Sequence, residues 1–386
     1  MPVPPTPHLR VDPVRLRRNV RRVADRAAAA GVLLRPHAKT HKCLEVARLQ
    51  LAGGAAGLTV ATVGEAEVLV RAGVRDLFLA YPVWVDDDRA DRLRALAEHA
   101  RVAIGVDSVM GAANSGRRLG GSGVEVLVEI DSGHHRTGVA PADAGEVAAA
   151  AARAGLPVRG AFTFPGHSYS PDAPGAAAVA EREALLAARL SMEAAGVPVH
   201  VLSGGSTPSL AASLDAALGG SLAGSSGGSL GAPPGASGPG DAGADDPGLA
   251  RVQWEQRPGV YVFNDAQQWE LGTCEPGDVA LTARATVVSH ASGRLVLDSG
   301  SKVLGADRAP WATGWGRLLE RPDARIVQLS EHHAVVEMEG VLPRIGTQVD
   351  VVPNHVCNAV NLADALWADE HGGLHRWPVA ARGLNG

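Results

Sequence analysis

Short β-branched runs alternate with alanine-rich segments of helical period over residues 32–264. The candidate strands are Val32–Leu34, Leu58–Thr62, Leu77–Tyr81, Val102–Asp107, Val124–Asp131, Val158–Phe164, Val199–Ser203 and Val260–Asn264. Strands that alternate with helices form βαβ units and a parallel sheet. Eight such units predict an α/β fold of the (β/α)8 TIM-barrel type. A doubly wound open sheet is the alternative, because periodicity alone does not show closure.

The pattern changes from about Cys274 onward. Short strand-like runs follow without long helical segments between them, at Val279–Ser289, Arg294–Leu297, Arg325–Leu329, Ala334–Met338 and Gln348–Val352. We therefore expect a barrel domain at residues 9–270 and a C-terminal, mostly β domain at residues 271–386. Residues 219–248 are rich in Gly, Ser, Ala and Pro, which predicts a flexible surface insertion with no chemical role.

Composition excludes several classes of protein. The net charge of −5 and the pI of about 6.3 give no electrostatic footprint for nucleic acid. No apolar run approaches the ~20 residues of a membrane span, and the N-terminus lacks the regions of a signal peptide. The three cysteines are widely spaced and odd in number. They argue against a disulfide framework and indicate a reducing cytoplasm.

One lysine is crowded by cations directly after the first candidate strand. Residues 35–42 read Arg-Pro-His-Ala-Lys-Thr-His-Lys, with Lys39 between His37, His41 and Lys42. Neighbouring cations and partial burial lower a lysine pKa, and a neutral amine is what Schiff-base chemistry with an aldehyde cofactor requires. Taken alone, the octet is equally compatible with a basic surface loop.

Further polar residues gather at the ends of the candidate strands, where barrel enzymes carry their chemistry. Ser203-Gly-Gly-Ser-Thr-Pro208 has the glycines and hydroxyls of a phosphate cradle, or of a tight N-capped turn. Arg136 could pair with an acidic oxygen, or lie on the surface. His167 and Tyr169 could present a base and a ring donor to one pocket, although a lone His is more often structural. Arg257–Tyr261 enters the eighth candidate strand.

A possible metal motif lies near the C-terminus. His355 and Cys357 are separated by one residue on a segment that we expect to be extended, so their side chains point the same way. Both are ligands suited to zinc, and a two-residue set favours an open catalytic site. By spacing alone, a buried Cys and an unrelated His is the preferred explanation.

Together these motifs resemble a known family. Residues 35–42, 59–67, 203–208, 257–261 and 353–357, in this order, resemble the fold-type III pyridoxal-phosphate enzymes of the D-serine dehydratase and D-threonine aldolase group. The barrel of these enzymes is similar to that of alanine racemase. The resemblance runs from about Leu9 to Leu362, except for the insertion at residues 219–248, where family members are usually shorter.

The resemblance implies a role for each motif. Lys39 would hold pyridoxal 5'-phosphate as a Schiff base; Arg136, from its own place in a loop after a strand, is predicted as a further cofactor contact. Tyr169 would face the pyridine nitrogen, and His167 would lie near the substrate β-hydroxyl. A divalent metal, zinc or manganese, would bind to His355 and Cys357. The family also implies a homodimer with the site near the subunit interface. The cofactor phosphate would be held by Ser203, Gly204, Gly205, Ser206, Thr207, Gly259 and Tyr261.

The expected activity is a lyase reaction on a small D-3-hydroxy amino acid. Removal of the α-proton by Lys39, with a metal polarising the β-hydroxyl, would convert D-serine to pyruvate and ammonia. Removal of the hydroxyl proton by His167 would instead split D-threonine into glycine and acetaldehyde. The soft pair His355 and Cys357 favours the D-serine dehydratase over the aldolase. A racemase needs no metal, and non-catalytic cofactor-binding relatives lack a second domain, so both are less favoured.

Overall fold

The barrel is visible in the computed structural model, which describes residues 4–219, 252–370 and 372–386. Eight parallel strands form one sheet in the order β2-β9-β8-β7-β6-β5-β4-β3. The outer strands β2 and β3 are joined by a bridge between His37 and Thr59 and by a hydrogen bond from the Thr59 N–H to the Pro36 carbonyl. The sheet is therefore closed, which confirms the barrel over the open sheet. Its strands are β2 (Leu33–Leu34), β3 (Leu58–Val60), β4 (Asp76–Pro82), β5 (Arg101–Val106), β6 (Glu125–Glu129), β7 (Val158–Phe162), β8 (Val201–Gly204) and β9 (Gln253–Gln256).

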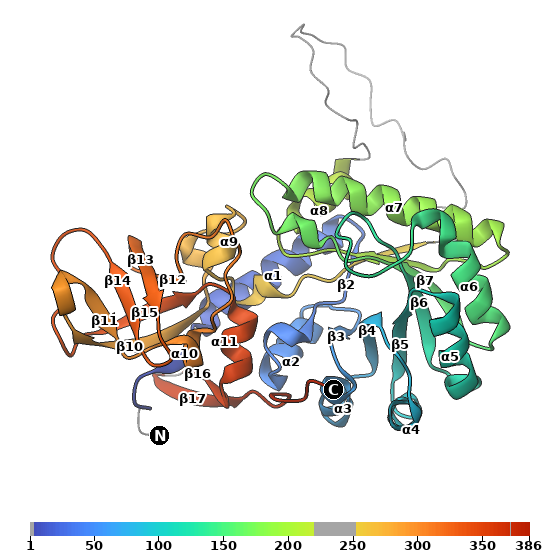
Figure 1. The fold of residues 1–386 in the computed structure, drawn as a ribbon. Helices are drawn as coiled ribbons and strands as arrows, with labels where there is room; N and C mark the ends of the chain where they lie inside the picture. Colours follow the sequence, from blue (N-terminus) through green and yellow to red (C-terminus); the bar gives the residue numbers. More distant parts are fainter. Residues whose placement is uncertain (1–3, 220–251, 371) are drawn as a thin grey trace, which may run out of the picture.

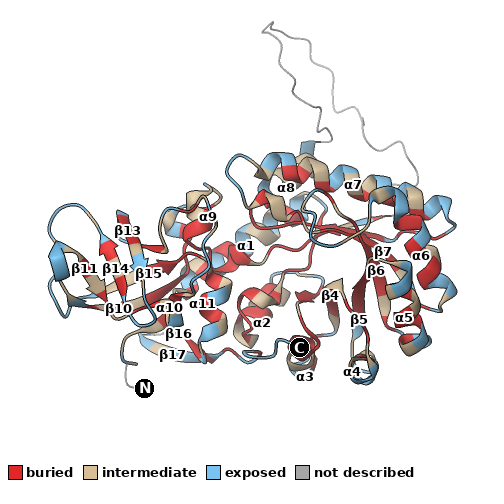
Figure 2. Cartoon of the chain, in the orientation of Figure 1, coloured by how far each residue is buried: buried red, intermediate tan, exposed pale blue. Residues whose placement is uncertain are grey.

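Helices cover the outside of the barrel, with their apolar faces on the strands and their polar faces in solvent (Figure 2). Several begin where the sequence supplies an N-cap: the side chains of Thr62, Asp86 and Ser108 each accept a hydrogen bond from the backbone N–H three residues later. The helices are α2 (Leu44–Ala52), α3 (Val63–Arg71), α4 (Asp87–Ala97), α5 (Val109–Leu119), α6 (Ala144–Arg153), α7 (Pro174–Ala194) and α8 (Leu210–Gly219).

The prediction of the last barrel strand was wrong. Val260–Asn264 is apolar, but it contains a 3-10 turn at Val260–Val262, and the eighth strand is Gln253–Gln256. Glu255 is 1% exposed and faces an ionic network inside the barrel, so this strand has no apolar signature. The Arg257–Tyr261 motif therefore follows the eighth strand instead of entering it, and this places the motif at the carboxyl ends of the strands.

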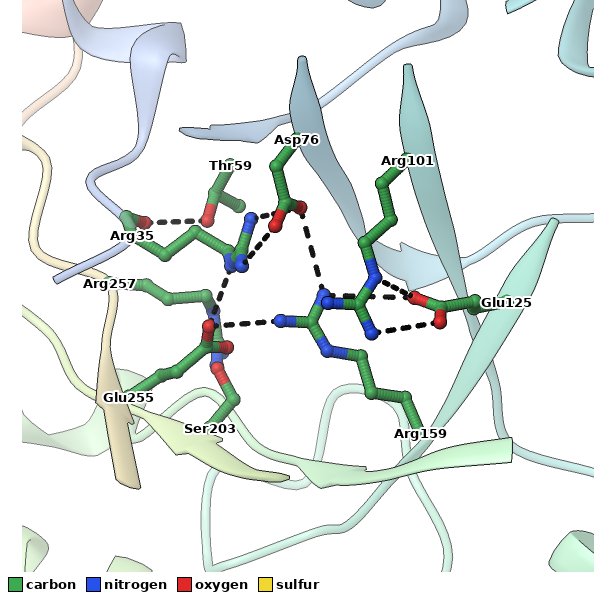
Figure 3. A network of polar contacts seen from close by, with 9 residues as sticks. All are labelled: Arg35, Thr59, Asp76, Arg101, Glu125, Arg159, Ser203, Glu255 and Arg257. Atoms are coloured by element: carbon green, nitrogen blue, oxygen red, sulfur yellow. Dashed lines mark hydrogen bonds and ion pairs between the residues drawn. The ribbon is translucent and has the colours of Figure 1, made fainter. Parts of the chain in front are cut away.

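Paired charges fill the amino-terminal half of the barrel interior (Figure 3). Arg35 is 1% exposed and forms ion pairs with Glu255 at 2.8 Å and with Asp76 at 2.6 Å. Arg159 reaches the same two carboxylates at 3.4 and 3.7 Å. Because an unpaired buried charge is strongly destabilising, the members of this network require one another. Two residues beyond Asp76, Phe78 packs edge-on against the ring of Phe162, with centroids 4.9 Å apart.

A second domain lies beside the barrel, with the long helix α1 (Pro13–Ala29) between the two (Figure 1). Its sheet has the order β11-β14-β13-β12-β15-β10-β1-β16-β17, and a further β11–β10 pairing closes part of it. The first strand, β1 (His8–Val11), belongs to this sheet, although these residues were expected in the barrel domain. The other strands are β10 (Leu281–Ser289), β11 (Leu295–Leu297), β12 (Gly316–Leu318), β13 (Arg321–Leu329), β14 (Ala334–Glu337), β15 (Gln348–Pro353), β16 (Ala365–Glu370) and β17 (Gly373–Pro378).

Three short helices accompany this domain: α9 (Ala266–Glu270), α10 (Ser301–Leu304) and α11 (Val356–Leu362). The C-terminal tail returns to the barrel beside α3, where the Thr62 hydroxyl donates to the Leu384 carbonyl at 2.7 Å. The predicted insertion at 219–248 lies outside the described residues except for Gly219, the last residue of α8. A search of the described helices finds none with the length and apolar character needed to span a bilayer.

Candidate active site

A cavity of about 270 Å³ opens at the carboxyl ends of the barrel strands, against the second domain. The structure brings many of the predicted site residues together there: Lys39, Arg136, Tyr169, Gly205, Ser206, Gly259, His355 and Cys357. Six further residues line it that were given no role in advance: His37, Thr40, Ala80, Phe164, Arg257 and Val260. One cavity thus joins the lysine motif, the glycine-rich loop and the His-x-Cys motif, which lie far apart in the sequence.

Lys39 lies in a single 3-10 turn (Ala38–Thr40) that follows β2. The backbone N–H of Lys39 donates to His37 Nδ1 at 3.4 Å, and its Nζ atom lies 5.8 Å from the centroid of the Phe164 ring. The second lysine of the octet is engaged elsewhere: Lys42 Nζ donates to Asn361 Oδ1 at 2.8 Å and pairs with Glu65 at 3.2 Å. Of the two lysines in this motif, Lys39 is therefore the one that reaches the cavity.

His37 is held neutral beside Lys39. Burial lowers the pKa of His37 well below its usual value, and the positive charges of Lys39 and Arg257 lower it further. A neutral imidazole adds no positive charge to the cavity and keeps Nδ1 available as a hydrogen-bond acceptor. The octet contained His37 only as a neighbouring cation, so its role as the cap of the turn was missed.

The glycine-rich loop after β8 carries a cluster of buried hydroxyls. Ser206 Oγ lies 2.7 Å from Ser168 Oγ and 2.8 Å from Ser209 Oγ. Ser203 does not line the cavity, because its Oγ accepts a hydrogen bond from the Arg257 guanidinium at 2.6 Å. Ser206 therefore remains as the hydroxyl of the loop that faces the cavity.

A close backbone approach explains the glycine of the Arg257–Tyr261 motif. A Cβ atom on Gly259 would lie 2.6 Å from the Thr40 hydroxyl, so no larger residue fits between this loop and the lysine turn. Thr207 lies behind the loop, where its Oγ1 accepts a hydrogen bond from the Tyr261 N–H at 3.2 Å. Glycine at a cavity wall and hydroxyls on the facing loop fit a phosphate group.

Tyr261 is not among the residues that line the cavity, and with its backbone N–H donated to Thr207 it supports the phosphate loop from behind. Its hydroxyl accepts a hydrogen bond from Gln50 Nε2 at 3.3 Å, and Gln50 Oε1 lies 3.1 Å from His41 Nε2. His41 in turn accepts the Cys43 N–H at 3.1 Å through Nδ1. This buried chain braces the segment after Lys39 against the segment after Gly259.

His41 gives a pH-dependent contribution to stability. Its side chain is fully buried, and burial lowers its pKa from 6.5 to about 4. His41 is therefore protonated near pH 6.5 in the unfolded chain, but only near pH 4 in the folded chain. The contribution is complete above pH 6.5 and is lost as the pH falls. We expect about 2 kcal/mol of it to be gone at pH 5.

This expectation can be checked by urea unfolding of the wild type and His41→Gln at pH 7, 6 and 5. The variant is less stable at pH 7, but its free energy of unfolding should fall less steeply with decreasing pH. Equal slopes for the two proteins would contradict the assignment.

Tyr169 closes the cavity from the loop after β7. Burial raises the pKa of its phenol, against the opposing effect of hydrogen bonds with Thr207, so the hydroxyl stays protonated as a donor. The Tyr169 carbonyl accepts a hydrogen bond from Trp311 Nε1 at 2.9 Å, which ties this barrel loop to the second domain. Arg136 lies 4.9 Å from the centroid of the Phe164 ring, with its guanidinium over the ring.

His167 is not among the residues that line the cavity. Its imidazole lies 3.5 Å from the Cβ position that Gly133 would have, and burial lowers its pKa. Within the described part of the chain, its Nδ1 atom is buried without a hydrogen-bond partner. His167 lies in the 3-10 turn Gly166–Ser168 after β7 and packs against the loop after β6.

His355 and Cys357 face the cavity from the second domain, although the expected extended segment was wrong. His355 is the N-cap of α11, and Cys357 is the second residue of that helix. The Cys357 sulfur lies 3.4 Å from the Thr40 hydroxyl oxygen, next to the lysine turn. Burial opposes ionisation of Cys357, but the charge of His355, its hydrogen bond, the charge of Lys39 and the Thr40 hydroxyl together outweigh burial and lower the pKa of the thiol.

Asp265 supports this pair from behind and was not predicted. It is fully buried; one carboxylate oxygen accepts the Val356 N–H at 3.1 Å and lies 3.7 Å from His355 Nδ1. Burial disfavours the His355 cation, yet the Cys357 thiolate and the Asp265 carboxylate outweigh burial and raise the pKa of His355 to about 10. A carboxylate behind a histidine is the usual way to orient a metal ligand.

The donor chemistry of the pair fits a divalent metal. An imidazole and a thiolate are the ligands that zinc prefers, and two protein ligands leave the other positions open to a substrate. No group of three or more His, Cys, Asp and Glu side chains placed to hold a metal occurs within residues 4–219, 252–370 and 372–386. A closed structural metal site is therefore not formed by these residues.

Comparison with known proteins agrees with this geometry. Residues 11–219 match the family model of the alanine racemase N-terminal domain, and residues 280–368 match a putative serine dehydratase domain. The chain is 33% identical to D-threo-3-hydroxyaspartate dehydratase of Delftia sp., over 91% of this chain and 90% of that protein.

Solved structures of the same group of enzymes are also similar to this chain. D-threonine aldolase from Filomicrobium marinum has a TM-score of 0.80 at 30% identity, covering 98% of this chain and 96% of its own. The Delftia dehydratase has a TM-score of 0.81 at 29% identity, with 97% of both chains covered. A cysteine-to-alanine mutant of D-threo-3-hydroxyaspartate dehydratase, with the same TM-score, is described as metal-free.

Proposed function

The chain belongs to the fold-type III pyridoxal-phosphate enzymes with an alanine racemase-like barrel and a serine dehydratase-like second domain, and from this premise we propose its reaction. We propose a lyase, dependent on pyridoxal phosphate and a divalent metal, that eliminates water from a D-3-hydroxy amino acid, with D-serine as the first candidate substrate. The product from D-serine would be pyruvate with release of ammonia.

The observation that carries this proposal is the meeting of Lys39, His355 and Cys357 at one cavity. A β-elimination needs a base at the α-carbon and a means of drawing electrons toward the β-oxygen. The Cys357 sulfur is 3.4 Å from the hydroxyl of Thr40, the residue that follows Lys39. An amine and a soft ligand pair therefore lie on adjacent parts of the cavity wall.

Each group in the cavity receives one task in this proposal. When bound, pyridoxal phosphate supplies an electron sink for the α-carbon, and the metal supplies a Lewis acid for the β-hydroxyl. Lys39 would hold the cofactor, and its amine would take the α-proton of the substrate. His355 and Cys357 hold the metal. Tyr169 and Arg136 donate to the cofactor ring. The phosphate would be held by Ser206 and by the backbone of Thr207 and Gly259. Ser203, Gly204, Gly205 and Tyr261 would support these segments without a free donor of their own toward the phosphate.

An aldolase reaction is the second candidate, because relatives with that activity are equally similar in fold. That reaction needs a base at the β-hydroxyl proton. His167, the residue expected in this role, does not line the cavity. The groups proposed for the dehydratase chemistry, Lys39, His355 and Cys357, all line the cavity, whereas the base proposed for the aldolase does not. This favours the dehydratase.

A product assay distinguishes the two reactions. The purified protein is supplied with pyridoxal phosphate and either zinc or manganese, and is given D-serine, D-threonine, D-threo-3-hydroxyaspartate or D-alanine. We expect pyruvate from D-serine and the matching keto acids from the other hydroxylated substrates, and no turnover of D-alanine, which has no β-oxygen. Glycine and an aldehyde without keto acid would establish the aldolase instead. Racemised D-alanine would contradict both.

A further inference from the structure

A buried carboxylate lies directly behind the glycine-rich loop after β8. Glu181, in the middle of the alanine-rich helix α7, is only 2% exposed. One of its oxygens accepts the Gly205 N–H at 2.7 Å, and the other accepts Gln256 Nε2 at 2.9 Å. Burial of a carboxylate is costly unless its oxygens are hydrogen bonded, so these two contacts are what makes the position tolerable. No step of the proposed reaction uses this residue.

The two glycines of the loop are required by this contact. A Cβ atom on Gly204 would lie 2.5 Å from the Glu181 carboxylate carbon. Gly205 has φ of +95°, and a Cβ atom there would collide with Gln256 Oε1. Only glycines at these two positions leave room for the hydrogen-bonded pair Glu181 and Gln256, which we call the clamp. Because the Gly205 N–H is already taken by Glu181, it is not free to bind phosphate.

The clamp joins the two chain segments that face the proposed phosphate position. Gly205 precedes Ser206, whose hydroxyl lines the cavity, and Gln256 precedes Arg257 and the Gly259 turn. A backbone hydrogen bond from Arg257 N to the Gly204 carbonyl at 2.8 Å adds to this link. Without Glu181, the direction of the Gly204–Gly205 peptide would depend on this one backbone bond, and the residues after it would lose their fixed orientation.

We propose that Glu181 is a positioning residue for the cofactor phosphate: it turns the N–H of the Gly204–Gly205 peptide away from the cavity, so that Ser206, the next residue of the loop, faces inward. The inference rests on the proposed binding of pyridoxal phosphate. Glu181 itself does not touch the cofactor. Its effect is therefore confined to the phosphate and does not extend to the aldehyde that Lys39 captures.

Two cofactor forms separate this role from a general loss of structure. Apoprotein is titrated with pyridoxal phosphate and, separately, with pyridoxal, which has the aldehyde but no phosphate. Visible absorbance of the lysine-bound form gives both dissociation constants. Glu181→Leu should weaken pyridoxal phosphate binding by roughly 10- to 100-fold, the loss expected for hydrogen bonds to a charged group. Pyridoxal binding should change less than about threefold.

A matched variant tests the hydrogen bonds without the charge. In Glu181→Gln, the carbonyl oxygen can accept the Gly205 N–H, and the amide can donate to Gln256 Oε1, which has no partner among the described residues. Rotation of the Gln256 amide would complete this pairing, so this variant should retain pyridoxal phosphate affinity. Glu183→Gln, at an exposed position of the same helix, is the control and should equal the wild type.

The outcomes are distinct. Equal weakening of pyridoxal and pyridoxal phosphate in Glu181→Leu, or no weakening of either, would overturn the inference. If Glu181→Leu does not fold, as judged by circular dichroism, Glu181→Asp replaces it, because the shorter carboxylate cannot reach the Gly205 N–H; the same selective loss is expected. Wild-type protein that binds neither form would instead refute the proposed cofactor.

Discussion

Lys39→Ala is expected to abolish turnover, with a loss of more than about 10⁴-fold, because the amine holds the cofactor and then acts as the base. The visible absorbance of the lysine-bound cofactor should disappear in the same variant. The structure supports this assignment, since the Lys39 turn forms the cavity wall between His37 and Thr40. Activity with D-serine and absorbance after addition of pyridoxal phosphate are the two measurements.

The chain offers a simple control, because it contains only three lysines: Lys39, Lys42 and Lys302. Lys302 is exposed and pairs with Glu331, so Lys302→Ala should keep full activity. Borohydride reduction of the loaded protein should fix the cofactor to a single peptide that contains Lys39. A label on Lys42 or Lys302, or residual turnover in Lys39→Ala, would show that the assignment is wrong.

The fold was largely predictable where strands are apolar on both faces. The first seven barrel strands are mostly buried between the helices and the interior, and their apolar runs identify them. The eighth strand, Gln253–Gln256, was not predicted, because Glu255 faces the ionic network around Arg35 and the barrel interior is charged at this point (Figure 3). Val260–Asn264 was mistaken for it, because burial under the second domain also produces an apolar run.

The site was predictable where the chemistry is local in sequence. Lys39, Gly259 and Cys357 lie in short motifs that carry their own signal, and the cavity brings them together. Asp265 and Glu181 gave no signal, because each acts on a partner that is distant in sequence: Asp265 on the His355 segment, and Glu181 on Gly205. A single carboxylate in an alanine-rich helix cannot be distinguished from a solvent-facing one until the tertiary contact is known.

Cys357→Ala and His355→Ala are expected to abolish dehydration while leaving the bound cofactor in place. Each removes one of two protein ligands, so the metal affinity should fall by more than the ~10–100-fold of an outer-shell change. The cofactor absorbance should persist, because neither side chain belongs to the lysine turn or to the phosphate loop. Removal of the metal from the wild type by a chelator should give the same result, and re-addition of zinc or manganese should restore turnover.

Two further variants serve as comparisons for the loss of metal affinity. Asp265→Asn keeps both ligands but removes the negative charge 3.7 Å from His355 Nδ1, so metal affinity should fall by only ~10–100-fold, and excess metal should recover the activity. Cys274→Ala removes a buried thiol that does not line the cavity and should leave metal affinity unchanged. The loss of metal affinity should be largest for Cys357→Ala, which removes a metal ligand. It should be smaller for Asp265→Asn, which removes the support of a ligand, and absent for Cys274→Ala, which does neither. Full activity of metal-free protein, verified by elemental analysis, would remove the Lewis acid from the reaction and with it the reason to require a β-hydroxyl in the substrate.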